Sequence, residues 1–152
     1  MIATGEPRDE EMAERIRRHR MERPPTWATV EEQLHLEEAI SAVPAGACAL
    51  VDCLTLWVSN LIERGLSDAE VEERAAKAAS AAATMPSPCI AVSNEVGSGI
   101  VPTAALARRF TDVLGRVNAI WAVEAERVLL VVAGRAMPLA NPADVLQELG
   151  GG

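Results

Sequence analysis

The 152-residue sequence is poor in aromatic residues. They make up 3% of the chain, with no tyrosine and one phenylalanine, whereas hydrophobic residues make up 49%. The core must therefore be built from Ala, Val, Leu and Ile, and this hydrophobic content argues against disorder. The length allows one compact domain, which we expect to span residues 1–152.

Cysteine is also scarce, with Cys48, Cys53 and Cys89 set far apart among apolar residues. The three form no CxxC pair and no Cys/His ligand spacing, which argues against a disulfide framework or a thiolate metal site. We expect buried, reduced thiols.

Basic residues are outnumbered, with 14 Lys and Arg against 22 Asp and Glu, a formal charge of −8 and a pI near 4.8. This balance argues against binding to nucleic acid or to an anionic membrane. No signal-peptide pattern opens the chain, and no apolar run is long enough to cross a bilayer. We therefore expect a cytoplasmic protein.

Short apolar segments alternate with helical patterns along the chain. Strands are predicted at 2–4, 47–52, 89–93 and 128–133, and helices at 9–22, 30–43, 54–64, 68–85 and 103–126. Thr29-Val-Glu-Glu32 reads as a capping box that opens the second helix, and Ser67-Asp-Ala-Glu70 as one that opens the fourth. The segment after Met137 is poorly patterned and is expected to pack loosely.

The strands lack polar alternation, which is typical of a parallel sheet with helices on both faces, an α/β fold. In such folds ligands bind beyond the carboxyl ends of the strands. The positions of interest are therefore those just after Thr4, Asp52, Ser93 and Ala133.

The segment around His19 reverses the acidic charge of the chain. It contains Arg15, Arg17, Arg18, Arg20 and Arg23, with Glu22 as the nearby acid. Such a run is commonly a solvated helix face. The alternative is an anion site, because guanidinium groups bind phosphate oxygens and nearby positive charge disfavours imidazolium. A neutral imidazole beside a polyphosphate is a plausible nucleophile at phosphorus, whereas His35 lacks such company and is expected to be structural.

Asp52 directly follows a predicted buried strand. Nucleotide-binding α/β proteins place a carboxylate there to hold Mg²⁺, although turn preferences alone also put Asp at strand ends. The glycine-containing loop 94–102 follows the next strand and is either a connection or a substrate contact. Trp27, Trp57 and Trp121 are interpreted as core or cleft packing.

Several segments together carry a family resemblance. They are Ile2-Ala-Thr4, the RI-x-x-H-x-x-x-RP block of residues 15–24 with Trp27, Leu50-Val-Asp52, the SNEVG-x-GIVP block of residues 93–102, Leu106-Ala-Arg-Arg-Phe110 and Leu130-Val-Val-Ala-Gly134. With them, nearly the whole chain resembles the bifunctional adenosylcobinamide kinase/adenosylcobinamide-phosphate guanylyltransferase family of cobalamin (vitamin B12) biosynthesis.

The resemblance implies a RecA-like P-loop NTPase fold and two reactions. A nucleoside triphosphate, such as ATP or GTP, phosphorylates the aminopropanol hydroxyl of adenosylcobinamide with the help of Mg²⁺. A histidine then attacks the α-phosphorus of GTP and expels pyrophosphate. The resulting guanylyl-histidine passes GMP to adenosylcobinamide phosphate.

The resemblance also assigns residues. His19 matches the guanylylated histidine, and Asp52 matches a carboxylate that binds nucleotide or Mg²⁺. The guanylyl-binding positions map onto Ala3, Thr4, Gly5, Arg20, Met21, Glu22, Arg23 and Glu31. The implied assembly is a homo-oligomer, a trimer.

One element of the family is missing from these residues. The family has a strand, a G-x-x-x-x-G-K-[ST] phosphate loop and a helix before the segment that matches Ile2-Ala-Thr4, and no such loop occurs in the chain. We therefore expect the fold without its first strand and P-loop, with unpaired sheet edges exposed. A start codon placed too late or a truncated gene would explain this. The alternative function is a catalytically inactive nucleotide-binding remnant or accessory subunit.

Overall fold

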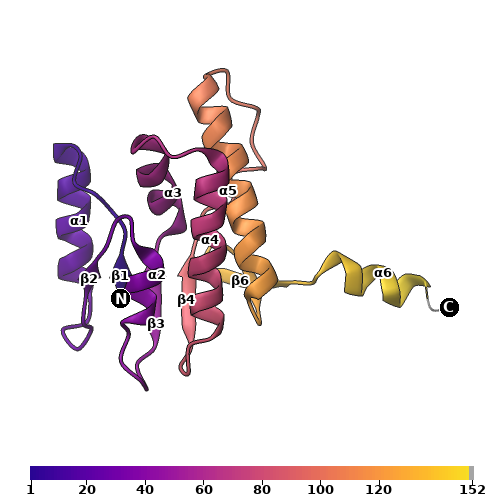
Figure 1. Cartoon of the computed structure of the whole chain (residues 1–152), viewed down its shortest axis with the longest axis horizontal. Coiled ribbons are helices and arrows are strands. Elements are labelled where there is room, and N and C mark those ends of the chain that lie inside the picture. The colour runs from indigo at the N-terminus through magenta and orange to yellow at the C-terminus, as the bar shows by residue number, and fades with distance from the viewer. Residues whose placement is uncertain (151–152) are drawn as a thin grey trace.

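The computed structural model describes residues 1–150 and contains a four-stranded parallel sheet flanked by helices (Figure 1). The strand order is β2-β1-β3-β4, with β1 at Ile2–Ala3, β2 at Val30–Glu31, β3 at Ala49–Asp52 and β4 at Cys89–Val92. The helices are α1 (Glu10–Glu22), α2 (Leu36–Ser41), α3 (Leu54–Glu63), α4 (Asp68–Ala83), α5 (Ala105–Glu124) and α6 (Pro142–Gly150). The predicted α/β fold with a parallel sheet is confirmed.

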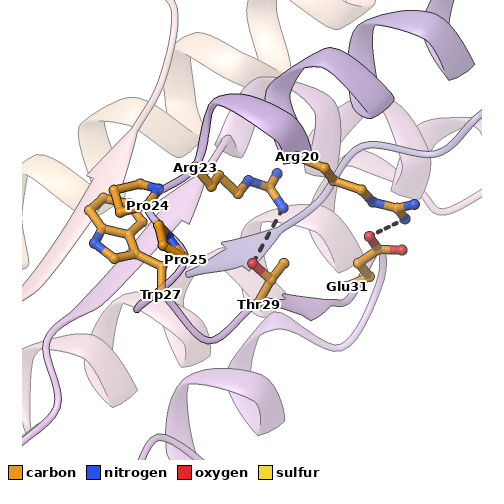
Figure 2. A pocket seen from close by; sticks show the side chains of 7 residues that line it. All are labelled: Arg20, Arg23, Pro24, Pro25, Trp27, Thr29 and Glu31. Atoms are coloured by element: carbon orange, nitrogen blue, oxygen red, sulfur yellow. Dashed lines mark hydrogen bonds and ion pairs between the residues drawn. The ribbon is translucent and has the colours of Figure 1, made fainter.

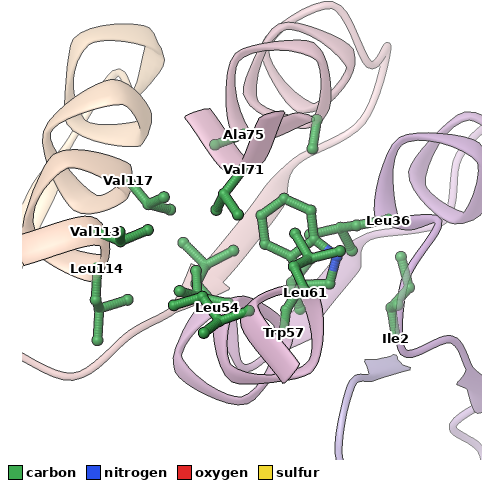
Figure 3. Packing of buried hydrophobic residues seen from close by; sticks show 14 of the residues in the cluster. Ile2, Leu36, Leu54, Trp57, Leu61, Val71, Ala75, Val113, Leu114 and Val117 are labelled. Atoms are coloured by element: carbon green, nitrogen blue, oxygen red, sulfur yellow. The ribbon is translucent and has the colours of Figure 1, made fainter. Parts of the chain in front are cut away.

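One hydrophobic cluster joins the sheet to helices α2, α3, α4 and α5 (Figure 3). Ile2 and Val51 contribute from the strands, and each is at most 1% exposed. Trp57 of α3 is the largest buried side chain, and its indole N–H donates to the carbonyl oxygen of Leu34 at 3.1 Å. The predicted core of aliphatic residues is therefore anchored by one aromatic ring whose polar atom is satisfied.

Helix α1 follows its local sequence signals closely. The Asp9 side chain caps it by accepting from the Met12 amide at 2.7 Å, acidic residues occupy its first turn and basic residues its last turn. This charge distribution suits the helix dipole. The helix buries no residue completely, and its apolar stripe of Met12 and Ile16 is half-buried. Most of α1, including His19, faces solvent.

The helix predicted at 30–43 is wrong in its first half. Val30–Glu31 forms β2, because the Val30 amide donates to Met1 O at 2.9 Å and the Glu32 amide to Ala3 O at 3.0 Å. The carboxylate of Glu32 accepts from the amides of Leu34 and His35, both at 2.8 Å, just before α2. Pairing with β1 thus overrides the capping-box pattern.

The strand predicted at 128–133 exists but does not join the parallel sheet. Strand β5 (Val128–Val132) pairs antiparallel with β6 (Arg135–Leu139) in a separate two-stranded sheet. Ala133 and Gly134 form the turn with φ of 50° and 71°, a combination that suits a two-residue hairpin loop. Helix α6 extends away from the other helices in Figure 1, and residues 141–147 are exposed.

Two expectations of burial are also wrong. Strand β4 is the edge of its sheet, and Ile90 and Val92 on one of its faces are 55% and 40% exposed. Cys48 is exposed, since it precedes β3 in a surface turn, whereas Cys53 and Cys89 are half-buried. All three thiols are free.

Candidate functional site

The carboxyl ends of three strands bring three of the predicted site residues into one row. Ala3 lies in register with Glu31 of β2 on one side and with Asp52 of β3 on the other. Side chains at matched positions of neighbouring parallel strands point to the same face of the sheet. Ala3, Glu31 and Asp52 therefore share one face at the edge where α/β folds bind ligands.

Thr4 fixes the backbone beside this row. Its side chain is completely buried, and its hydroxyl donates to Cys53 O at 2.7 Å and accepts from the Cys53 amide at 2.8 Å. These bonds leave the hydroxyl committed to the protein. Gly5 lies between α1 and α3, where an added Cβ would stand 3.5 Å from the side chains of Ile16 and Leu56, an ordinary contact distance.

Asn60 is a structural centre of this edge to which the sequence reasoning assigned no role. It is 2% exposed, and its side-chain amide donates to Thr4 O at 2.8 Å and to Gln33 O at 3.1 Å, while its oxygen accepts from Arg8. The available signal was a polar residue on the buried face of α3, three positions after Trp57. Asn60 thus joins the ends of β1 and α3 to the loop before α2.

Asp52 is half-buried at the end of β3. Within residues 1–147 no group of three or more His, Cys, Asp or Glu side chains is placed to hold a metal ion. A single carboxylate fits Mg²⁺ only when substrate phosphates and water supply the other ligands, which is the usual arrangement in phosphoryl-transfer enzymes. Burial raises the pKa of the neighbouring Cys53 thiol, and the negative charge of Asp52 adds to this effect.

A hollow of about 350 Å³ lies where α1 ends and the chain turns back into β2 (Figure 2). It is lined by Arg20, Arg23, Pro24, Pro25, Trp27, Thr29 and Glu31. Figure 2 shows Trp27 and the prolines at one end and Arg20 with Glu31 at the other. Three residues that the resemblance assigned to guanylyl binding, Arg20, Arg23 and Glu31, therefore line one cavity.

The arginines of this hollow differ in how they are held. Arg20 forms an ion pair with Glu31, which ties α1 to the row of strand ends. Arg23 donates to the Thr29 hydroxyl at a long 3.4 Å, and its Nε is buried without a hydrogen-bond partner in the part of the chain that the structure describes. A buried donor without an acceptor is energetically costly, so the hollow is suited to an anion.

His19 lies one turn before Arg23 on α1 and does not line the hollow itself. Its side chain is 54% exposed, and its Nδ1 stands 3.9 Å from a carboxylate oxygen of Glu22. Of the arginines around it, Arg17 is paired with Glu14 and Arg20 with Glu31, so part of the local positive charge is neutralised. Met21 is 71% exposed beside it.

The loop after β4 is tied to two helices at its beginning. The Asn94 amide donates to the Thr55 hydroxyl at 2.9 Å, and Asn118 of α5 accepts from Ser93 at 2.6 Å and donates to Asn94 O at 3.1 Å. Further along, Ile100 is 99% exposed. The start of the loop is thus fixed, whereas its apolar tip is available for contact.

In the described residues, no helix is both long and apolar enough to cross a membrane. Residues 1–139 match the family described as cobinamide kinase / cobinamide phosphate guanyltransferase. The bifunctional adenosylcobalamin biosynthesis protein CobP of Pseudomonas aeruginosa strain PAO1 is 43% identical over 139 residues, which cover 91% of this chain and 80% of the relative.

Two further relatives are the bifunctional adenosylcobalamin biosynthesis proteins CobU of Escherichia coli K12 and of Salmonella typhimurium LT2. Each is 40% identical over 146 residues, which cover 88% of this chain and 81% of the relative. The chain therefore belongs to the cobinamide kinase / cobinamide phosphate guanyltransferase family.

Proposed function

We propose that this chain acts in cobalamin biosynthesis as an adenosylcobinamide kinase and adenosylcobinamide-phosphate guanylyltransferase, with His19 as the residue that carries the guanylyl group. The observation that supports it most is the arginine-lined hollow one turn from an exposed imidazole. The family membership supports the two activities and their nucleotide substrates, ATP and GTP.

In the proposed guanylyl transfer, a nitrogen of neutral His19 attacks the α-phosphorus of GTP. The N–P bond forms as the bond to the bridging oxygen of the β-phosphate breaks, and pyrophosphate leaves. A phosphate oxygen of adenosylcobinamide phosphate then attacks the same phosphorus, the N–P bond breaks, and His19 is regenerated. Glu22 stands on the Nδ1 side of the ring, which supports Nε2 as the attacking atom.

The other assigned residues act by position and charge in this proposal. Arg20 and Arg23 stabilise the charge on the phosphates, and Glu31 holds Arg20. Ala3, Thr4 and Gly5 shape the end of β1, and Met21 and Glu22 border the imidazole. Asp52 would hold Mg²⁺ together with substrate phosphates, and the metal would neutralise charge on the transferred phosphoryl group.

The kinase step has less support within these residues. The chain has no G-x-x-x-x-G-K-[ST] segment whose backbone would surround the β- and γ-phosphates. We expect the chain as given to be poor at phosphoryl transfer even where guanylyl transfer survives.

We also propose a homo-oligomer, a trimer as the resemblance implies. Exposed apolar side chains on β4, β5 and β6 support association, because large apolar surface is seldom left to water. Sedimentation velocity on the purified chain measures the assembly state, and a monomer at micromolar concentration would contradict this proposal.

The test of guanylyl transfer uses α-labelled GTP and two matched variants. His19 and His35 are both exposed and each has a Glu three residues later, at 3.9 and 3.7 Å. We expect an acid-labile, base-stable adduct on the wild type and on His35→Asn, and none on His19→Asn. No adduct on any of the three would favour the inactive remnant, and an adduct that persists in His19→Asn would remove His19 from the reaction.

A further inference from the structure

We propose that the indole of Trp27 is the surface on which the purine base of the bound nucleotide stacks. The inference rests on the proposed guanylyl transfer at His19 and adds a residue that selects the substrate by its base. It starts from the composition of the hollow, which has guanidinium groups at one end and an aromatic ring with two prolines at the other (Figure 2).

The backbone holds Trp27 in place before any ligand arrives. The Trp27 amide donates to Pro24 O at 3.0 Å and closes a tight turn over residues 24–27. Two consecutive prolines fix φ at the first two positions of this turn, so the unbound chain has little freedom to lose. A rigid support of this kind lowers the entropic cost of binding a flat ligand.

The exposure of Trp27 sets it apart from the other tryptophans. Trp57 is 1% exposed, and Trp121 is half-buried against the core, whereas Trp27 is 46% exposed at the rim of the hollow. Leaving this much of an apolar ring in water forfeits the free energy that its burial would give. A stacked base would cover the ring and recover part of that free energy.

The opposite end of the hollow defines the rest of the ligand. Arg23 has a buried, unpartnered Nε within the described residues and only one long hydrogen bond, to Thr29, so its guanidinium can turn to a phosphate at small cost. A ligand that contacts both ends of this hollow of about 350 Å³ has a planar aromatic group joined to an anion. A nucleoside monophosphate unit has both parts. Stacking favours the larger π-surface of purines over pyrimidines but does not separate guanine from adenine.

The experiment measures binding without chemistry, in the full chain carrying His19→Asn so that no covalent adduct forms. Calorimetric titrations with GMP, CMP and ribose 5-phosphate are compared for this parent chain, which keeps Trp27, and for the same chain with Trp27→Phe or Trp27→Leu. Phe retains an aromatic face, whereas Leu retains apolar volume without one. Circular dichroism of each variant establishes that it is folded.

We expect Trp27→Leu to bind GMP about 5- to 150-fold more weakly, the range that alanine substitution of a stacking aromatic produces. Trp27→Phe should retain most of the affinity for GMP. Trp27→Leu should weaken the binding of CMP less than that of GMP, and ribose 5-phosphate should bind the parent chain and both variants with the same affinity. Equal GMP affinity in the Phe and Leu variants, or an equal loss for ribose 5-phosphate, would overturn the proposal.

The labelling of His19 by GTP separates the two proposals. If His19 takes no label but Trp27→Leu weakens GMP selectively, the transfer chemistry is wrong and the base-binding residue stands. If His19 is labelled and Trp27→Leu binds GMP as the parent does, the stacking proposal alone fails.

Discussion

The hydroxyl of Thr4 donates to the carbonyl oxygen of Cys53 at 2.7 Å and accepts from the amide of the same residue at 2.8 Å. Thr4 has no exposed surface, so water cannot replace either bond. Because Cys53 follows Asp52 directly, these bonds fix the backbone beside the carboxylate. The hydroxyl of Thr4, a residue that the resemblance assigns to nucleotide binding, is therefore committed to the backbone of Cys53.

Thr4→Val should lower the free energy of unfolding by about 1–3 kcal/mol, because valine keeps the shape but leaves the amide of Cys53 without its acceptor. The carbonyl oxygen of Cys53 still accepts from the Trp57 amide at 3.2 Å in this variant. Urea denaturation measures the change. Thr4→Ser is the matched control, since it keeps the hydroxyl. Equal stability of the Val and Ser variants would show that the two hydrogen bonds contribute nothing.

The ion pair between Arg20 and Glu31 joins helix α1 to the row of strand ends. Both side chains are about half exposed, 52% and 41%, so the pair should contribute no more than about 1 kcal/mol to stability. Arg20→Ala should nevertheless slow the labelling of His19 by GTP about 10- to 150-fold, because a charge-assisted contact to phosphate is lost.

Arg17→Ala provides the control for this prediction. Arg17 lies on the same helix and forms an ion pair with Glu14, but it does not line the hollow. We expect its labelling rate to stay close to that of the wild type. If both variants slow labelling equally, general positive charge on α1 matters, and the hollow does not.

Elements with local signals could be predicted from the sequence to within a few residues. The box of Ser67 and Glu70 is present at the start of α4, and Asp9 caps α1, because caps depend on residues three positions apart. Strand β2 (Val30–Glu31) could not be predicted, since the amides of Val30 and of the following Glu32 donate to Met1 O and Ala3 O, which lie far back in the sequence. Strand β6 was missed because Pro138 argues against a strand in a local pattern, although an edge strand tolerates it.

The site shows the same division. The charge reversal around His19 is visible in the sequence, and so is the carboxylate after β3. Arg20 of α1 pairs with Glu31 of β2, which is 11 residues further along the chain. The side-chain amide of Asn60 donates to the carbonyl oxygen of Thr4, 56 residues earlier. Contacts of that kind depend on the tertiary fold, so the charged groups of the site could be predicted from the sequence, whereas the contacts that hold them could not.

Cys48 should be the first of the three thiols to react with iodoacetamide. Cys48 is exposed. Burial raises the pKa of the Cys89 thiol to about 11, and the negative charge of a Cys48 thiolate nearby raises it further by a smaller amount. Burial also raises the pKa of the Cys53 thiol. At pH 8 roughly one Cys89 in a thousand is then a thiolate, which is the reactive form. Peptide mass spectrometry over time measures the order, and labelling in urea is the control in which all three should react. If Cys89, the first residue of β4, is modified in the folded chain as fast as Cys48, its partial burial does not protect it and the prediction is wrong.

Asp68 joins the start of α4 to α5 and should make stability depend on pH. It accepts from Arg109 at 2.8 Å and from Arg116 at 2.9 Å, and the hydrogen bond from Arg109 is the largest cause that lowers its pKa below the usual 3.8. A lowered pKa in the folded state means that the stabilisation is complete above pH 3.8 and is lost as the pH falls through the lower, folded value. The side chain is 43% exposed, so solvent screening limits the contribution to less than about 1 kcal/mol.

The difference in unfolding free energy between the wild type and Asp68→Asn isolates this effect, because all other carboxylates titrate in both. Urea denaturation at intervals from pH 7 to pH 2.5 should show a constant advantage for the wild type down to about pH 4 and a shrinking one below it. Arg109→Gln in the same series should reduce the advantage of Asp68 at pH 7 and move its loss to higher pH, since the largest cause of the lowered pKa is removed. An advantage that grows as the pH falls would reverse the sign and rule out the ion pairs as its origin.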